Sequence, residues 1–143
     1  MIGFFPDPRP DELLYSACAR FSDRMKFPNV NRAASVMFGG KSPRAVVDFP
    51  TRINNLMSVM PPNHKYTPDI LIDSNTLYPY FAPFLPANRA RLFREDMCGD
   101  GNHIHERLGI TAGRLTLPEV LRFCPECIIA LCACIETATY ATH

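Results

Sequence analysis

The sequence has almost no net charge, no long apolar run and no export signal, and each of these shortages excludes a class of protein. Its formal charge is +1 over 143 residues, so bulk electrostatics point neither to nucleic acid nor to an anionic membrane. Its longest apolar run, Cys127–Ile135, has nine residues, whereas a membrane-spanning helix needs about 20. No basic cluster precedes the short apolar run Ile2–Phe5, so no signal peptide is predicted. We therefore expect a cytoplasmic protein with no membrane partner.

Proline, by contrast, is abundant. The 14 prolines are about twice average usage, and both long helices and central strands tolerate proline poorly. Hydrophobic residues make up 47% of the chain and charged residues 20%, as in ordinary globular proteins. The expected fold is mainly α: a small helical domain over residues 1–117, followed by a partial zinc-binding module over residues 118–143.

Apolar residues at helical spacing, together with capping and breaking residues, predict the individual helices. The first is expected to open at Asp11–Glu12 and the second at an Asn29 cap. A third is expected to start at Asp48–Pro50, and a fourth to run from a Thr67 cap to Ile72. Further helices or turns are predicted at residues 87–98, 104–108 and 118–123. The proline-rich segment Tyr78–Pro86 is predicted to be irregular, with its aromatic side chains buried.

Basic residues are concentrated in one region. Residues 20–52 contain seven Lys or Arg against two acids, and two short helices meet there at Gly39–Ser42. This pattern is typical of a helix-turn-helix that binds DNA, but a helical bundle with a solvated basic face gives the same pattern. The candidate DNA-binding residues are Arg20, Arg24, Arg32, Lys41, Arg44 and Arg52.

Four of the six cysteines lie between residues 124 and 134. Cys124 and Cys127, separated by Pro125-Glu126, have the spacing of half a tetrahedral zinc site. The remaining ligands would have to come from Cys132, Cys134 or His143, although that spacing is not a standard one. Cys132 and Cys134 could equally be small buried hydrophobic residues. A zinc ion shared between two chains would make a homodimer.

No nucleotide-binding loop and no nucleophile elbow is present, and nothing in the sequence demands an enzyme. The alternative is a metal-dependent hydrolase that uses His103 and His105, with a neighbouring carboxylate to activate water. Polar residues at a turn before a helix explain the same pattern without any metal.

Several segments, in order and spacing, resemble TniQ/TnsD-type transposition proteins. The resemblance spans about residues 2–128, and the segments that carry it are Phe4–Ser16 with Arg20, Thr76–Pro86, Arg94–Met97 and Arg122–Cys127.

This resemblance implies a non-enzymatic target-site selector for DNA transposition. Family members combine a helix-turn-helix-like region with a zinc module, in which Cys124 and Cys127 would be the first ligand pair. They recruit an AAA+ transposition ATPase to a site by binding DNA or a CRISPR-type guide-RNA complex. The basic stretch from Arg20 to Arg52 would contact that DNA or partner.

The tail departs from the family pattern. After Cys127 the chain continues with the apolar run Ile128–Ile135 and contains neither Trp nor Lys or Arg, whereas family members continue with a polar segment and a second ligand pair. We therefore expect that the reading frame is shifted or truncated beyond this point, and an inactive remnant is a further alternative. Family-like sequence in another frame of the encoding DNA would support this expectation.

Overall fold

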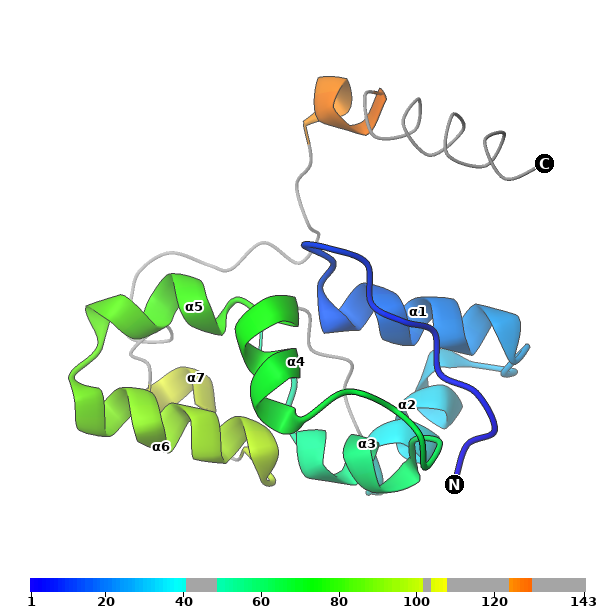
Figure 1. Cartoon of the computed structure of the whole chain (residues 1–143), viewed down its shortest axis with the longest axis horizontal. Helices are drawn as coiled ribbons and strands as arrows, with labels where there is room; N and C mark the ends of the chain where they lie inside the picture. Colours follow the sequence, from blue (N-terminus) through cyan, green and yellow to red (C-terminus); the bar gives the residue numbers. More distant parts are fainter. Residues whose placement is uncertain (41–48, 102–103, 108–123, 130–143) are drawn as a thin grey trace. The chain divides into compact units, whose positions relative to one another are not determined.

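The computed structural model describes residues 1–40, 49–101, 104–107 and 124–129, and all regular structure within them is helical (Figure 1). The chain divides into two compact units, Met1–Thr111 and Ala112–His143. The mainly α-helical fold is confirmed, whereas the boundary predicted at residue 117 and the helix predicted at 118–123 lie outside the described residues. The named elements, all in the first unit, are α1 (Leu14–Arg24), α2 (Val30–Phe38), α3 (Ile53–Val59), α4 (Pro68–Asn75), α5 (Tyr78–Phe81), the 3-10 turn η1 (Ala82–Phe84), α6 (Ala87–Cys98) and α7 (Ile104–Arg107).

Two helices begin at the caps that the sequence predicts. The Asn29 side chain accepts a hydrogen bond from the Arg32 amide at 2.8 Å, and the Thr67 hydroxyl accepts one from the Ile70 amide at 3.2 Å. Each satisfies a backbone donor that has no partner inside its helix. Helix α4 then continues to Asn75, beyond the predicted end at Ile72.

Two predicted helix starts are wrong. Helix α1 begins at Leu14 rather than at Asp11–Glu12, because Asp11 adopts a left-handed φ of 58° and the Glu12 carboxylate accepts the Arg9 amide instead. Helix α3 begins at Ile53. Its preceding residue, Arg52, is also left-handed, so the helix cannot extend back towards Pro50.

The proline-rich segment contains more helix than predicted. Tyr78–Phe81 form one α-turn, and Ala82–Phe84 continue it as a 3-10 turn, because proline is tolerated in the first turn of a helix. Its side chains are also less buried than predicted: Tyr80 is 70% exposed and Phe84 81%. Met25 and Leu92, which lie at the apolar spacing of their helical segments, are also 48% and 46% exposed.

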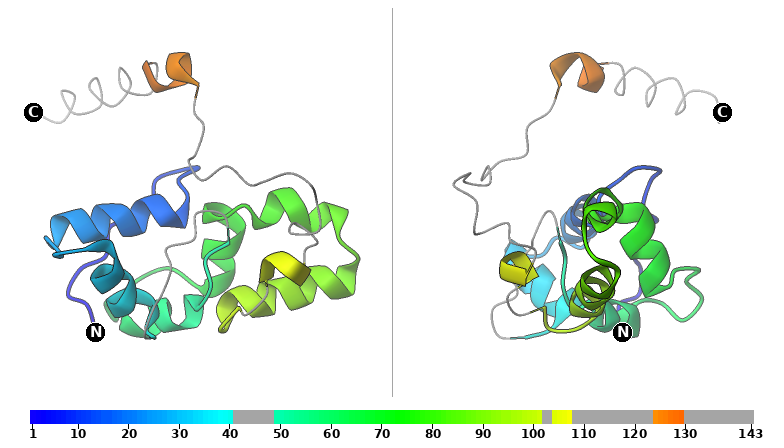
Figure 2. Two further views of the ribbon diagram at one scale, coloured as in Figure 1. Left: turned by 180° about the vertical axis from the view of Figure 1, so that it is seen from behind. Right: turned by 90° about the vertical axis from the view of Figure 1, so that its left-hand side faces the viewer.

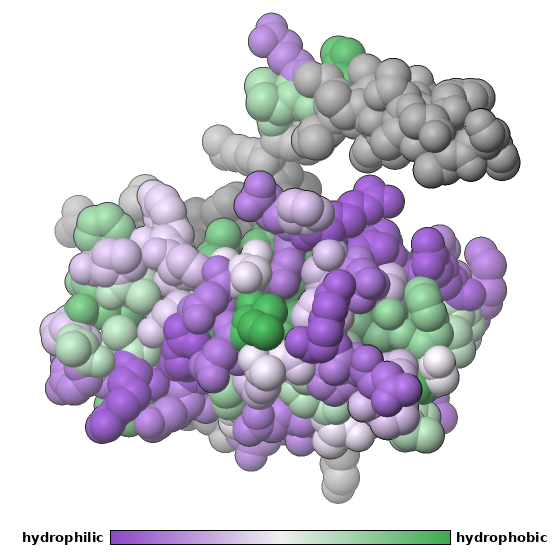
Figure 3. Space-filling model, viewed as in Figure 1, coloured by the Kyte–Doolittle hydropathy of each residue, from purple (hydrophilic) through white to green (hydrophobic). Residues whose placement is uncertain are grey.

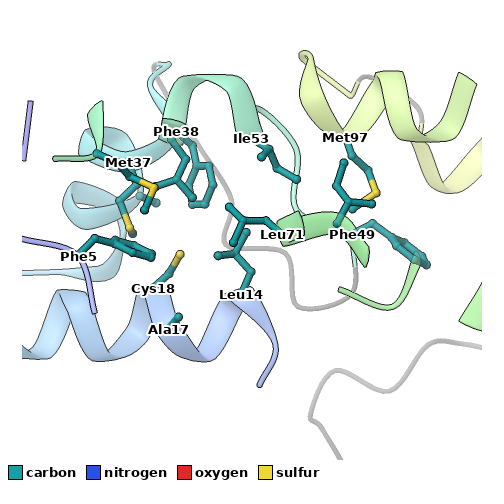
Figure 4. Close-up of a cluster of buried hydrophobic side chains, with 14 of the residues drawn as sticks. Phe5, Leu14, Ala17, Cys18, Met37, Phe38, Phe49, Ile53, Leu71 and Met97 are labelled. Atoms are coloured by element: carbon teal, nitrogen blue, oxygen red, sulfur yellow. The ribbon is translucent and has the colours of Figure 1, made fainter. Parts of the chain in front are cut away.

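The core of the first unit is a single cluster of apolar side chains from α1 to α7. Figure 4 shows Ala17 and Cys18 of α1 facing Met37 of α2, and Leu71 of α4 between Leu14 and Ile53. Burying such side chains is the dominant favourable term in folding, so this cluster holds the helices together.

The helices of the first unit fall into two groups, with α4 between them. Helices α1 to α3 lie at one end and α5 to α7 at the other, as the left view of Figure 2 shows. Among the described residues, no helix combines the length and the hydropathy needed to cross a bilayer.

Candidate nucleic-acid interface and cysteine pair

Helices α1 and α2 form a pair joined by a short connection, residues 25–29. The turn closes because Lys26 takes a left-handed φ of 52° and its amide donates to the Asp23 carbonyl at 3.2 Å. The Phe27 ring then packs against Phe21 of α1, with ring centroids 5.7 Å apart. Two helices and a tight turn are the elements of a helix-turn-helix.

Three cations are exposed along this pair: Arg24, Lys26 and Arg32. The Arg24 guanidinium lies 5.4 Å from the centroid of the exposed Phe4 ring. The Lys26 ammonium is 3.8 Å from the Asp23 carboxylate, and both side chains are more than four-fifths exposed, so this ion pair is weak. No ion pair engages the Arg32 side chain within the described part of the chain. These three cations are therefore placed to meet an external anion.

Two of the predicted DNA-binding residues instead bridge parts of the fold. Arg20 donates to both carboxylate oxygens of Glu12, at 2.9 and 2.6 Å, and to the Asp7 carbonyl. Arg52 contacts the Asp100 carboxylate at 3.1 Å and donates to the Gly39 carbonyl at 3.2 Å. Both side chains are thus already committed to intramolecular partners.

Lys41, Arg44 and His103 lie outside the described residues. Gly39 closes α2 with a φ of 68°, as predicted, but the next described helix begins only at Ile53. The short junction predicted at Gly39–Ser42 therefore stays a prediction. Of the two predicted histidine ligands, His105 is half-buried, and its ring lies 5.8 Å from that of Phe49.

Cys124 and Cys127 lie in the second unit and are exposed. Residues 125–129 form a helical turn directly after Cys124, and the Ile128 amide donates to the Cys124 carbonyl at 3.1 Å. Hydrogen bonds from the backbone and side chain of Cys127, and from the backbone of Glu126, lower the pKa of the Cys124 thiol. The turn therefore brings the two thiols together, the arrangement that half of a zinc site requires.

The other described cysteines are less accessible than this pair, since Cys18 is buried and Cys98 half-buried. Burial, with the charge of Glu12, raises the pKa of the Cys18 thiol to about 12, and burial also raises that of Cys98. Metal binding needs the thiolate. Cys132, Cys134 and His143 lie outside the described residues, and within those residues no three His, Cys, Asp or Glu side chains form a group that could hold a metal.

Tyr80 and Phe84 form an exposed aromatic pair, although the sequence predicts that both rings are buried. Their spacing of four residues was the available signal, because residues four apart share one face of a helix. Nearby, α6 presents Arg89 and Arg91 to solvent.

Comparison with known proteins identifies the family. The sequence model of a family described as TniQ matches residues 3–133. The chain is also 27% identical over 128 residues to the "Transposon Tn7 transposition protein TnsD" of Escherichia coli, an alignment that covers 87% of this chain. The chain spans about a quarter of the length of that relative, whose covered share is 25%. The match over residues 3–133 shows that this chain belongs to the TniQ family.

Proposed function

We propose that the chain is a non-enzymatic adaptor in DNA transposition, which helps to select the target site and recruits an AAA+ transposition ATPase. Its membership of the TniQ family and its similarity to a transposition protein support this role. It reaches the site by binding DNA or a guide-RNA complex.

The observation that carries the proposal is the set of exposed cations on the α1–α2 pair. Arg24, Lys26 and Arg32 have no strong intramolecular partner within the described residues, whereas Arg20 and Arg52 do. Cations that neutralise phosphates release condensed counterions, which gives salt-dependent affinity with little sequence preference. Lys41 and Arg44, which follow α2 in the sequence, are proposed as further phosphate contacts.

The test is duplex binding as a function of salt. In fluorescence anisotropy with a labelled 20-base-pair duplex, the double variant Arg24→Ala/Arg32→Ala should bind more weakly than the unaltered chain. The slope of log affinity against log salt should fall by about 2, because each phosphate contact contributes about 0.9. Lys41→Ala/Arg44→Ala should act in the same direction.

Lys65→Ala is the matched control. Lys65 is 73% exposed but lies on the α3–α4 connection, where it contacts Asp7 at 3.8 Å. Its removal should leave the slope unchanged. Equal slopes for the control and for Arg24→Ala/Arg32→Ala would contradict a nucleic-acid role for the α1–α2 pair.

We also propose that Cys124 and Cys127 supply two ligands to a structural Zn²⁺. A tetrahedral ion needs two more, for which Cys132, Cys134 and His143 are the candidates. The zinc ion would stabilise the fold of the second unit and would take no part in catalysis. Native mass spectrometry should find one zinc per chain, lost in Cys124→Ser/Cys127→Ser, whereas one zinc per two chains would indicate a homodimer that shares half-sites.

Recruitment of the ATPase is tested by co-elution of the two purified proteins in size-exclusion chromatography, with and without duplex DNA. A complex that forms with the ATPase in both conditions supports the adaptor role. Failure to co-elute both with and without duplex DNA would contradict it.

A further inference from the structure

The corner between α5 and α6 exposes two aromatic rings that have no role in the proposed function. Tyr80 is 70% exposed and Phe84 81%, and their ring centroids lie 6.5 Å apart. Figure 3 shows green surface at this end of the first unit, over α5 and the start of α6, with purple surface beside it. Contiguous exposed apolar surface on a folded domain marks an interaction site, whereas single exposed apolar residues do not.

The Tyr80 ring is held in place by a series of aromatic contacts that leads into the core, and Phe84 lies beside it. Tyr80 packs edge-on against Phe81 at 5.2 Å. Phe81 packs edge-on against Phe49, also at 5.2 Å, and Phe49 is fully buried. Pro83 and Pro86 restrict the backbone on either side of Phe84. Tyr80 is therefore anchored before anything binds, which lowers the entropic cost of binding.

The charge of the corner is positive. No Asp or Glu occurs among residues 74–94, whereas Arg89 and Arg91 lie on the first turns of α6. Both arginines are exposed. Arg91 is 3.7 Å from Glu95, and no ion pair engages the Arg89 side chain among the described residues. The third arginine, Arg94, binds Asp69 and Asp73 and so contributes little positive field.

We propose that this corner binds single-stranded DNA, with unpaired bases stacking on Tyr80 and Phe84 and the backbone phosphates facing Arg89 and Arg91. Ordered aromatic rings beside cations are the combination that binds single strands without sequence preference. A duplex hides the faces of its bases, so it could use only the arginines.

DNA is the proposed occupant because two groups of the corner that could recognise a ribose 2′-hydroxyl already have partners within the protein. The Tyr78 hydroxyl donates to the Ala90 carbonyl at 3.1 Å, and the Asn88 side-chain oxygen accepts the Arg89 amide at 2.9 Å. The affinity then comes from bases that stack on the two rings and from phosphates that face the two arginines, and single-stranded DNA can make both contacts.

The test uses the full chain and three labelled 12-mers in fluorescence anisotropy: oligo-dT, oligo-rU and an abasic DNA strand. The abasic strand keeps the phosphates and lacks the bases. We expect oligo-dT to bind at least tenfold more tightly than the abasic strand and at least as tightly as oligo-rU. Tyr80→Ala and Phe84→Ala should each weaken oligo-dT binding about tenfold and leave abasic binding unchanged.

Three further variants separate stacking from other causes. Phe84→Trp should keep oligo-dT binding, whereas Phe84→Leu, which remains apolar but cannot stack, should lose it. Tyr15→Ala removes an exposed ring from α1, 37% exposed, and should bind as the unaltered chain does. Urea unfolding should confirm that Phe84→Leu is folded.

Several results would overturn the proposal. They are oligo-dT binding by Phe84→Leu at full strength, equal affinity for the abasic strand, or affinity for oligo-rU alone. The first of these would indicate an apolar protein-docking surface. The proposal is independent of the α1–α2 interface: Arg24→Ala/Arg32→Ala should weaken duplex binding and keep the preference for oligo-dT over the abasic strand.

Discussion

At the scale of single residues, Glu12 links the N-terminal segment to α1. Its carboxylate accepts hydrogen bonds from Arg20, the Arg9 amide and the Ser16 hydroxyl, and the side chain is only 10% exposed. Burial alone would raise its pKa, but these hydrogen bonds outweigh that effect and lower the pKa from 4.5 to about 2. Because the folded-state pKa is the lower one, the interaction stabilises the fold fully above about pH 4.5 and is lost as the pH falls towards 2.

Glu12→Gln should therefore lower the free energy of unfolding by about 2 kcal/mol at pH 7, since hydrogen bonds to charged groups contribute about 1.5–3 kcal/mol. Urea unfolding at pH 7, 4.5 and 3 should show the difference shrinking as the pH falls. The control is Asp23→Asn, whose side chain is 85% exposed and which should change the stability by less than about 0.5 kcal/mol. A difference that stays constant with pH would show that the ionised carboxylate is not responsible.

At Arg52, the backbone strain and the side-chain contacts can be tested separately. Its φ is 60°, a conformation that costs a non-glycine residue about 1–2 kcal/mol, and its guanidinium joins Gly39 to Asp100. Arg52→Ala should destabilise the fold because it loses these contacts and keeps the backbone strain. Arg52→Gly should be more stable than Arg52→Ala by about 1 kcal/mol, measured by urea unfolding. Equal stabilities would mean that the strain is relieved elsewhere.

At the scale of elements, the sequence predicts a helix well where a local signal starts it. Asn29 and Thr67 cap their helices as expected, because a capping side chain and its acceptor amide are only three residues apart. The starts of α1 and α3 were missed because each is set by contacts outside the first turn of its helix. Glu12 turns towards Arg20, and the Arg52 amide donates to the Gly99 carbonyl at 2.7 Å.

The cap of α2 can be tested on its own. Asn29→Ala should lower the free energy of unfolding by about 1 kcal/mol, the usual cost of losing such a cap. Asn29→Asp should retain most of the stability, because a carboxylate can also accept the Arg32 amide. Thermal unfolding followed by circular dichroism measures both variants. If Asn29→Asp were as unstable as Asn29→Ala, the hydrogen bond would not be the source of the stability.

At the scale of the whole molecule, composition identifies the basic stretch of the candidate site. It cannot show which of its cations are paired within the fold and which are exposed. Arg20 and Arg24 are four residues apart in one helix, yet one binds Glu12 and the other faces solvent. The acid that engages Arg20 is identifiable only from the fold. The exposure of Tyr80 and Phe84 also depends on the fold. Of the neighbouring rings, Phe81 is the one that packs against the buried Phe49, so the other two remain at the surface.

The core cluster described above lies wholly within residues 2–104, inside the unit Met1–Thr111. A fragment of residues 1–111 should therefore fold alone, with a free energy of unfolding within about 1 kcal/mol of that of the whole chain, because it loses none of these buried contacts. The fragment contains four of the five tyrosines, so tyrosine fluorescence in urea can follow both proteins. It should keep the salt dependence of duplex binding and bind no zinc. A chelator should leave the tyrosine transition of the whole chain unchanged, whereas a shift to lower urea would mean that the metal stabilises the first unit as well as the second.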